Sequence, residues 1–190
     1  GVPLSKGWVS GENIVCPYHG LQYNEQGKCI KIPAQPELTK ISDRFSLTKF
    51  PVVEKYGLIW TSLFSRNEIA ANFPVLDTWD TAEHQSILPP FVDIAGSSGR
   101  QLEGFIDVAH FAWVHHNAFA DRDNPVVPKY NTERTPYGLH TEYVSNVSNY
   151  PHGMQHLAPE GFLWKRVFDV YPPFSAILTV HFPNEGILKI

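Results

Sequence analysis

Cysteine is scarce in this sequence of 190 residues, which contains only Cys16 and Cys29. Two cysteines are too few for the disulfide framework that stabilises many small secreted proteins. A disulfide between them is the alternative for a secreted protein, whereas two free thiols fit a reducing cytoplasm, and we expect a cytoplasmic protein. The sequence begins at Gly1 rather than at a methionine, and we interpret it as a piece of a longer chain.

Charge of one sign and long apolar runs are also missing. Fifteen Lys and Arg stand against 19 Asp and Glu, for a net charge of −4. The basic residues are scattered, so we expect no basic surface for nucleic acid or for an anionic membrane. No stretch approaches the roughly 18 apolar residues that span a bilayer. The 43% hydrophobic content still suffices for a core, so the sequence predicts a folded protein with neither a nucleic-acid nor a membrane partner.

The first third of the sequence consists of short strand-like segments between turns. Turn residues occur at 11–13 and 24–27, and β-branched and aromatic residues favour strands at Cys29–Ile32, Phe45–Val53 and Leu58–Leu63. Prolines at positions 74, 89 and 90 and the absence of a clear period indicate a connection after residue 64. The sequence therefore predicts a small all-β module over residues 1–63 and a second domain over residues 64–190.

The second domain combines one helix with several strands. Residues Glu103–His115 are apolar almost all round, which predicts a buried helix. Strands are expected at Leu139–Val147, Phe162–Tyr171 and Ser175–Phe182, the first of them introduced by a turn at residues 135–138. The predicted fold is thus α+β, with the all-β module followed by antiparallel sheet wrapped on a buried helix.

Cys16 and His19 are separated by two residues, a spacing that lets one tight turn present a thiolate and an imidazole to the same metal site. Such pairs also arise by chance, since buried thiols and hydrogen-bonded histidines are common. Pro17 and Gly20 favour a turn, in which backbone amides can point at cluster sulfurs. Cys29 lies in a predicted strand at no ligand spacing, and we expect a packed thiol there.

Asp107, His110 and His115 place one carboxylate and two imidazoles in the apolar helical segment, where each must be paired or coordinated. Asp107 and His110 are about 60° apart around a helix, but His110 and His115 are about 140° apart. A straight helix cannot bring both imidazoles to one ion, so it must unwind or bulge before His115, or end just before it. His116, about 120° away on the other side, is expected to face solvent.

Alternatively, His115 and His116 form an exposed helix terminus, where imidazolium meets the negative end of the helix dipole. That interpretation leaves Asp107 and His110 unexplained inside the apolar segment. A sulfur-and-nitrogen site together with a nitrogen-and-oxygen site allows one chain to receive electrons at one iron centre and use them on O₂ at another. The two motifs together indicate an oxygenase.

These motifs resemble the catalytic α subunit of Rieske non-haem iron aromatic-ring oxygenases. The resemblance covers nearly the whole chain: residues 1–5, Cys16–Gly20, the strand at Gly57–Trp60 and the spacing Asp107-x₂-His110-x₄-His115. Residues 105–115 look most like the homo-oligomeric branch that includes vanillate demethylases and toluenesulfonate methyl-monooxygenases. The resemblance implies a Rieske [2Fe–2S] module followed by part of a catalytic domain.

The resemblance also implies roles for individual residues. Cys16 and His19 would be half of the [2Fe–2S] ligand set, and His110 and His115 would bind mononuclear Fe(II). Asp107, the catalytic candidate, would accept a hydrogen bond from a ligand imidazole and reach toward the Rieske histidine of a neighbouring subunit, which would make it an electron bridge. The implied partners are an aromatic substrate, O₂, a ferredoxin or flavin reductase, and further copies in a homotrimer.

Both ligand sets are half missing by the same resemblance. The family's first cluster His lies about sixteen residues before the second Cys, which places it before Gly1, and its third iron ligand is an acid far beyond the second His. We therefore expect residues 1–190 to be inactive by themselves. Alternatively, Asp121, Asp123 or Glu142 could complete the iron site, but nothing in their spacing favours them.

The expected reaction is hydroxylation, demethylation or ring dihydroxylation of an aromatic compound with O₂. Aromatic residues near the second motif can line a flat pocket or form core: Phe111, Trp113, Phe119, Phe162 and Trp164. One alternative is a Rieske-type electron-transfer protein without its own oxygenase chemistry, which would not need the second motif. Another is a β-rich ligand-binding domain with a structural zinc held by Cys16, His19 and two other histidines.

Overall fold

The computed structural model describes residues 2–64 and 73–190. It divides into two compact units, residues 1–71 and 72–190, and each unit is described by itself. The boundary expected near residue 64 borders residues 65–72, which lie outside the described residues. Within the described part, no helix has both the length and the apolar character that crossing a bilayer requires.

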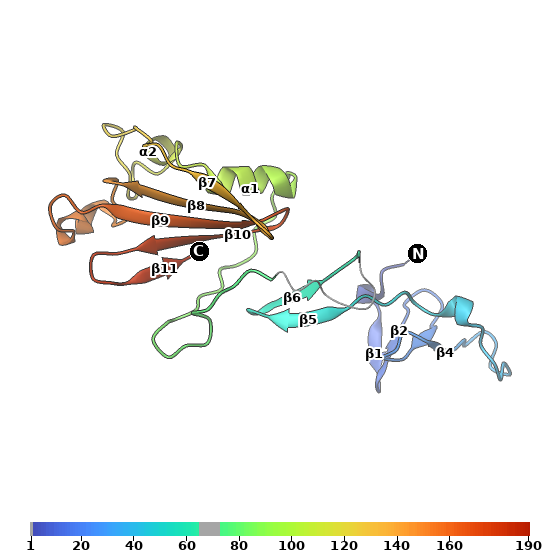
Figure 1. Ribbon diagram of the computed structural model, residues 1–190. Helices are drawn as coiled ribbons and strands as arrows, with labels where there is room; N and C mark the ends of the chain where they lie inside the picture. Colours follow the sequence, from blue (N-terminus) through green and yellow to red (C-terminus); the bar gives the residue numbers. More distant parts are fainter. Residues whose placement is uncertain (1, 65–72) are drawn as a thin grey trace. The chain divides into compact units, whose positions relative to one another are not determined.

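The first unit is built from short antiparallel strands (Figure 1). One sheet has the order β1-β2-β3-β4, with bounds Trp8–Ser10, Asn13–Val15, Gln22–Tyr23 and Cys29–Lys31. A separate hairpin pairs β5 (Val52–Lys55) with β6 (Leu58–Thr61). Two 3₁₀ turns complete the unit, η1 (Leu4–Lys6) and η2 (Asp43–Phe45). The loop between β2 and β3 carries the Cys16–Gly20 motif, so that motif is anchored at both ends by paired strands.

The predicted strand at Phe45–Val53 is wrong over most of its length. Its first residue, Phe45, ends the 3₁₀ turn η2. Ser42 caps this turn, and its Oγ accepts a hydrogen bond from the backbone N–H of Arg44. Only Val52 and Val53 belong to β5. A serine that bonds its own backbone offers an alternative to the strand ladder, which the residue types alone did not reveal.

The second unit contains a five-stranded antiparallel sheet in the order β11-β10-β9-β8-β7 (Figure 1). Its strands are β7 (Thr132–Thr135), β8 (Gly138–Ser145), β9 (Trp164–Tyr171), β10 (Ser175–His181) and β11 (Ile187–Lys189). The turn between β7 and β8 requires glycine at position 138, because a Cβ there would lie 2.0 Å from the carbonyl oxygen of Val170. The strands expected from Leu139, Phe162 and Ser175 onward correspond to β8, β9 and β10.

One face of this sheet forms the core with the helical segment. Tyr143, Phe168 and Val170 are buried together with Val108, and partly buried residues of the helical segment pack against them: Leu102, Phe105, Ile106 and Phe111. The burial of β9 alternates strictly, with Trp164, Arg166, Phe168 and Val170 on the buried side. Figure 1 shows α1 lying along the same sheet. The core therefore sits directly beneath the residues of the second motif.

The single buried helix expected over Glu103–His115 is wrong. The chain forms α1 (Ser98–Ile106), capped by Ser97, and then a separate short helix, α2 (Phe111–Val114). Asp107 has an extended backbone, and its Oδ1 accepts a hydrogen bond from the backbone N–H of Ala109 at 2.8 Å. This local bond competes with the helical ladder and ends α1.

Burial of the helical segment also differs from the expectation. None of the residues of α1 is fully buried, and in α2 only Ala112 is. Trp113 and Val114 are 58% and 66% exposed. Only one side of the helical segment packs on the sheet. The segment is therefore less buried than its apolar composition predicted. His115 lies just beyond the end of α2, which confirms one of the two geometries that the spacing allowed.

Candidate metal centres

The Cys16–Gly20 segment is a closed turn. The backbone N–H of Cys16 donates to the carbonyl of Leu21 at 2.9 Å, and the N–H of Gly20 donates to the carbonyl of Cys16 at 3.0 Å. Gly20 has a φ of 70°, and a Cβ there would lie 3.1 Å from Cγ of Pro33. Glycine therefore permits a left-handed turn close to Pro33, and the turn holds Cys16 and His19 on one short loop.

The two cysteines have different environments, although both are free thiols. Cys29 is only 7% exposed, and its Sγ lies 3.7 Å from the carbonyl oxygen of Lys31. Cys16 is half-buried, and His19 is exposed with its ring centroid 3.9 Å from that of Tyr18. Burial first, then the charges of Cys29 and Cys16, raise the pKa of Tyr23. Cys29 is thus a core thiol, whereas Cys16 and His19 can reach a ligand.

One thiol and one imidazole are consistent with half of a Rieske site. In such a cluster two cysteines hold one iron and two histidines hold the other. Cys16 and His19 would therefore supply one ligand to each iron. Among residues 2–64 and 73–190, no group of three or more His, Cys, Asp or Glu comes together in a way that could hold a metal ion, so the described residues also offer no structural zinc site.

His110 and His115 lie at the two ends of α2 and come together in space. Their ring centroids are 5.0 Å apart, with an angle of 60° between the ring planes. Imidazole nitrogens bind metals at about 2 Å, so two rings this close can share one ion. Phe111 stands edge-on to both rings, at 5.1 Å and 6.1 Å between centroids. The tight fold after His115, where its carbonyl accepts from Ala118 and Phe119, stacks the Phe119 ring on His115 at 5.2 Å.

The surroundings of His115 favour its neutral imidazole. Burial first, and then the neighbouring His110, lower the pKa of His115 below its usual value. The neutral form is the one that binds a metal. Oδ2 of Asp107 lies 3.4 Å from Nδ1 of His110, with the side chains 48% and 25% exposed. A carboxylate at Nδ1 holds the ring proton there and leaves Nε2 for a metal.

His116 is half-buried rather than facing solvent, which corrects the expectation. Its Nδ1 lies 2.9 Å from the carbonyl oxygen of Trp113, to which it donates, so the ring is engaged with the backbone of α2. Its carbonyl in turn accepts a hydrogen bond from Nε2 of His152, in the 3₁₀ helix η3 (His152–Leu157). His116 therefore helps to hold the end of α2.

Asp121 and Glu142, two of the three acids considered as a third iron ligand, have other partners. Oδ1 of Asp121 accepts from the backbone N–H of Asp123 at 2.9 Å. Glu142 pairs with Nζ of Lys165 at 2.5 Å. Neither acid forms a group of three with the histidine pair among the described residues.

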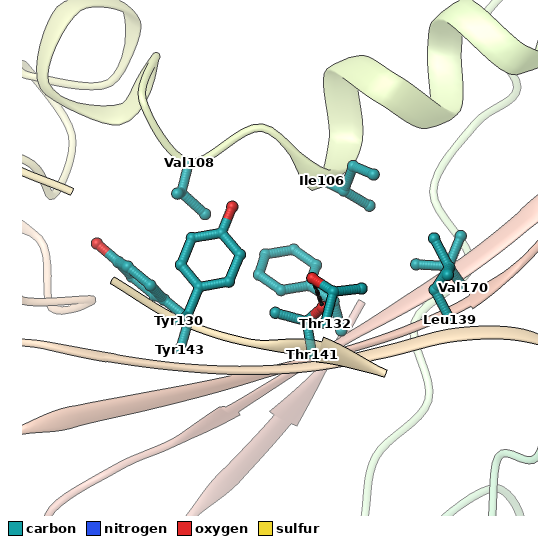
Figure 2. Close-up of a pocket in the computed structure, with 9 residues that line it drawn as sticks. Ile106, Val108, Tyr130, Thr132, Leu139, Thr141, Tyr143 and Val170 are labelled. Atoms are coloured by element: carbon teal, nitrogen blue, oxygen red, sulfur yellow. Dashed lines mark hydrogen bonds between the residues drawn. The ribbon is translucent and has the colours of Figure 1, made fainter. Parts of the chain in front are cut away.

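A cavity of about 130 Å³ lies between the helical segment and the sheet (Figure 2). Apolar side chains and four hydroxyl-bearing residues line it: Ile106, Val108, Leu139, Phe168, Val170, Thr132, Thr141, Tyr130 and Tyr143. Figure 2 shows side chains of the sheet facing Ile106 and Val108 across it. Oγ1 of Thr141 donates to Oγ1 of Thr132 at 2.8 Å.

The aromatic residues that could either line a flat pocket or form core do not line this cavity. Trp113 is exposed, and Trp164 is 1% exposed in core, edge-on to Phe162. Phe111 and Phe119 instead contact the histidine pair. Sequence reasoning missed the hydroxyl-bearing residues, although the alternation along β8 placed Thr141 and Tyr143 on one face. It also missed Arg166, the one charged residue on the apolar side of β9.

Comparisons with known proteins show which proteins this chain resembles. Residues 1–51 match the family model of the Rieske [2Fe–2S] domain. Methylxanthine N1-demethylase NdmA of Pseudomonas putida is 33% identical over 128 residues, which are 66% of this chain and 36% of the relative. The iron–sulfur subunit TsaM1 of the toluene-4-sulfonate monooxygenase system of Comamonas testosteroni is 27% identical over 113 residues, 60% of this chain and 32% of the relative.

The solved structure of Pseudomonas putida CBB5 NdmA with caffeine superposes with a TM-score of 0.77 and 26% identity. The superposition covers 97% of this chain and 52% of that one, so both units have counterparts there, and the chain spans about half the length of that relative. The shared domain, sequence and fold confirm the resemblance that the two motifs suggested. The chain therefore contains a match to the Rieske [2Fe–2S] domain and is similar, in both of its units, to the catalytic α subunits of Rieske non-haem iron oxygenases.

Proposed function

We propose that the protein to which this chain belongs is an oxygenase component that hydroxylates or demethylates an aromatic substrate with O₂. Residues 1–63 form the Rieske module and residues 64–190 part of the catalytic domain. The observation that carries the proposal is the His110–His115 pair, with Asp107 beside it, in a chain whose residues 1–51 match a Rieske domain. A protein that only transferred electrons would need no imidazole pair apart from its cluster ligands.

Cys16 and His19 hold the cluster end of the electron path. The closed turn fixes both donors relative to the backbone, and the exposed His19 leaves its iron accessible to a redox partner. A ferredoxin or flavin reductase is the proposed electron donor. The other two cluster ligands come from outside this pair.

His110 and His115 would hold the mononuclear iron. A carboxylate other than that of Asp107 would complete its ligand set. When bound, the cluster supplies single electrons and the iron activates O₂ at positions that the three ligands leave open. Asp107 keeps the proton of His110 on Nδ1 and presents Nε2 to the metal. Its partly exposed side chain can also contact a neighbouring subunit, which fits the proposed homotrimer and the bridge role.

The cavity supports a flat, mostly apolar substrate. Its lining is apolar except for four residues with hydroxyl groups, which can orient a few polar substituents. Related proteins are named for methylxanthine demethylation and toluenesulfonate oxygenation. We assign an aromatic or heteroaromatic ring that carries an oxidisable methyl group to this site, in a cytoplasmic enzyme.

The test uses the intact protein with a reductase, NADH and a panel of N-methylated and O-methylated aromatic compounds. The expected result is formaldehyde release that depends on O₂ and is lost in both Cys16→Ser and His110→Ala. Unchanged release in His110→Ala would contradict the assignment of His110 to the iron site. No release from any of the compounds, in a wild-type protein whose cluster is still reduced by NADH, would contradict the oxygenase assignment and leave electron transfer as the function. A colourless protein that contains zinc would instead favour a structural metal.

A further inference from the structure

Arg166 is the most deeply buried charged residue of the second unit. It projects from β9 on the core side of the sheet and is 0% exposed. Its guanidinium donates to Oγ of Ser145 at 3.0 Å, to the carbonyl oxygen of Val147 at 2.7 Å and to Oδ1 of Asn149 at 2.9 Å. All three acceptors are neutral and belong to the end of β8 and the loop after it.

The charge of Arg166 has no acidic partner within the described residues, since none of their ion pairs includes it. Burial lowers its pKa to about 10, which still leaves the guanidinium charged at neutral pH. A buried charge without a counter-ion costs several kcal/mol unless other interactions offset it. Four hydrogen bonds to one loop satisfy most of the guanidinium donors, but they do not balance its charge, because all three acceptors are neutral.

Two aromatic rings supply the rest of the environment. The Cζ atom of Arg166 lies 5.6 Å from the ring centroid of Phe111 and 5.6 Å from that of Tyr143. A guanidinium at this distance is attracted to an aromatic ring, and more strongly when both are desolvated. Phe111 is the residue that stands edge-on to both His110 and His115.

We propose that Arg166 is a positioning residue for the mononuclear iron site, which it serves by fixing the Phe111 ring against the imidazoles of His110 and His115. The inference rests on the proposed role of these histidines. Phe111 begins α2 and the histidines flank that helix, so a ring held from the sheet side orients both ends of a helix of only four residues. Such a short helix has little stability of its own. Its geometry must come from contacts like this one.

The competing explanation is purely structural: Arg166 ties down residues 145–149, and its loss would loosen the whole unit. The two explanations differ in the dependence on Phe111. If Arg166 acts through the ring, removing the ring should make the arginine irrelevant to metal binding. If Arg166 only anchors the loop, the effects of the two substitutions should add.

The experiment measures Co(II) binding to the intact protein after removal of the mononuclear iron, because Co(II) reports its ligand geometry through visible absorption. Arg166→Met and Phe111→Leu should each weaken Co(II) affinity by about 10-fold to 100-fold, the range for groups that orient metal ligands. Each should also change the Co(II) spectrum and leave the cluster spectrum unchanged. The double variant should bind Co(II) no more weakly than Phe111→Leu alone.

Two further variants keep the test decisive if Arg166→Met does not fold. Arg166→Lys keeps the charge but loses the planar fork, and should weaken Co(II) binding in wild-type Phe111 protein but not in Phe111→Leu protein. Ser145→Ala removes one loop hydrogen bond without touching Phe111, and should lower stability while leaving the Co(II) affinity unchanged. Additive losses, or equal weakening by Ser145→Ala, would overturn the inference. If a variant that lacks both His110 and His115 binds Co(II) as tightly as the wild-type protein, the proposed function fails as well.

Discussion

Oδ2 of Asp107 lies 3.4 Å from Nδ1 of His110, while Oδ1 of the same carboxylate accepts the backbone N–H of Ala109 at 2.8 Å. The side chain of Asp107 thus ends α1 and faces the imidazole of His110, the residue that precedes α2. Asp107 can therefore be a structural acid, an orienting group or an electron bridge. A change of charge without a change of shape separates these roles.

Asp107→Asn keeps an oxygen for the Ala109 bond but removes the negative charge. We expect the variant to retain a reducible cluster and part of its mononuclear iron, yet to lose most product formation, because electrons reach the iron too slowly. Rapid mixing of the reduced protein with substrate and O₂ measures the rate of cluster reoxidation. An unchanged rate would remove the bridge role, and complete loss of iron would make Asp107 a direct ligand.

Asp121→Asn is the matched control for this prediction. Oδ1 of Asp121 also accepts a backbone N–H from the residue two positions ahead, Asp123, at 2.9 Å. Within the described residues, no ion pair joins Asp121 to the histidine pair. Both variants preserve the local turn and remove one charge. Only Asp107→Asn should slow cluster reoxidation; a similar slowing in Asp121→Asn would point to a general effect of charge.

Substitutions of the three histidines after α1 are expected to have very different effects on mononuclear iron binding and turnover. His110→Ala or His115→Ala should abolish mononuclear iron binding and turnover and leave the cluster absorption intact, because the two centres use separate ligands. His116→Ala removes one bond to the carbonyl of Trp113 and should cost about 1 kcal/mol of stability at most, with iron retained. Iron analysis of the three purified variants checks this. Loss of iron in His116→Ala with retention in His115→Ala would shift the assignment by one residue.

Residues 1–190 alone should hold no stable [2Fe–2S] cluster, because Cys16 and His19 provide two of the four ligands that the irons require. Reconstitution with iron and sulfide followed by electron paramagnetic resonance is the measurement. We expect no Rieske signal from this chain and a signal from a longer one that supplies a further Cys-x-His. A signal from residues 1–190 would show that other residues here provide the missing ligands.

The stability of the metal-free protein should fall as the pH is lowered from about 7. The pKa of His115 is lowered from the usual 6.5, first by burial and then by His110. The unfolded chain therefore takes up this proton at a higher pH than the folded chain, and unfolding is favoured as the pH drops below 6.5 through the folded value. Urea unfolding measured at steps of about one pH unit between pH 7.5 and 5 gives the free energy of unfolding at each pH and tests the trend. In His115→Gln the slope should be smaller; an equal slope would assign it to other groups.

Local chemistry in the sequence was enough to identify the two motifs and the antiparallel architecture. The spacing of Cys16 and His19 predicted a turn, and the residue types at Phe162–Tyr171 predicted a strand, which forms over Trp164–Tyr171. Each prediction depends on residues that are neighbours along the chain. The spacing of His110 and His115 also required a helix that ends or distorts before the second imidazole. Each of these conclusions follows from local backbone geometry, which a sequence pattern expresses directly.

Other features depended on a local hydrogen bond that competes with the helix, or on groups far apart in the sequence. The break at Asp107 came from a side chain that competes with the helix for a backbone N–H, and the partial exposure of Trp113 and Val114 came from which side of the helical segment meets the sheet. The cavity is lined by residues of the sheet and by Ile106 and Val108 of the helical segment. The contact between Arg166 and Phe111 likewise joins a β-strand to the helical segment across the core. The sequence determined which side chains were available for metal and electron chemistry; only tertiary packing decided which of them meet, because contacts between distant residues depend on how the elements pack rather than on spacing along the chain.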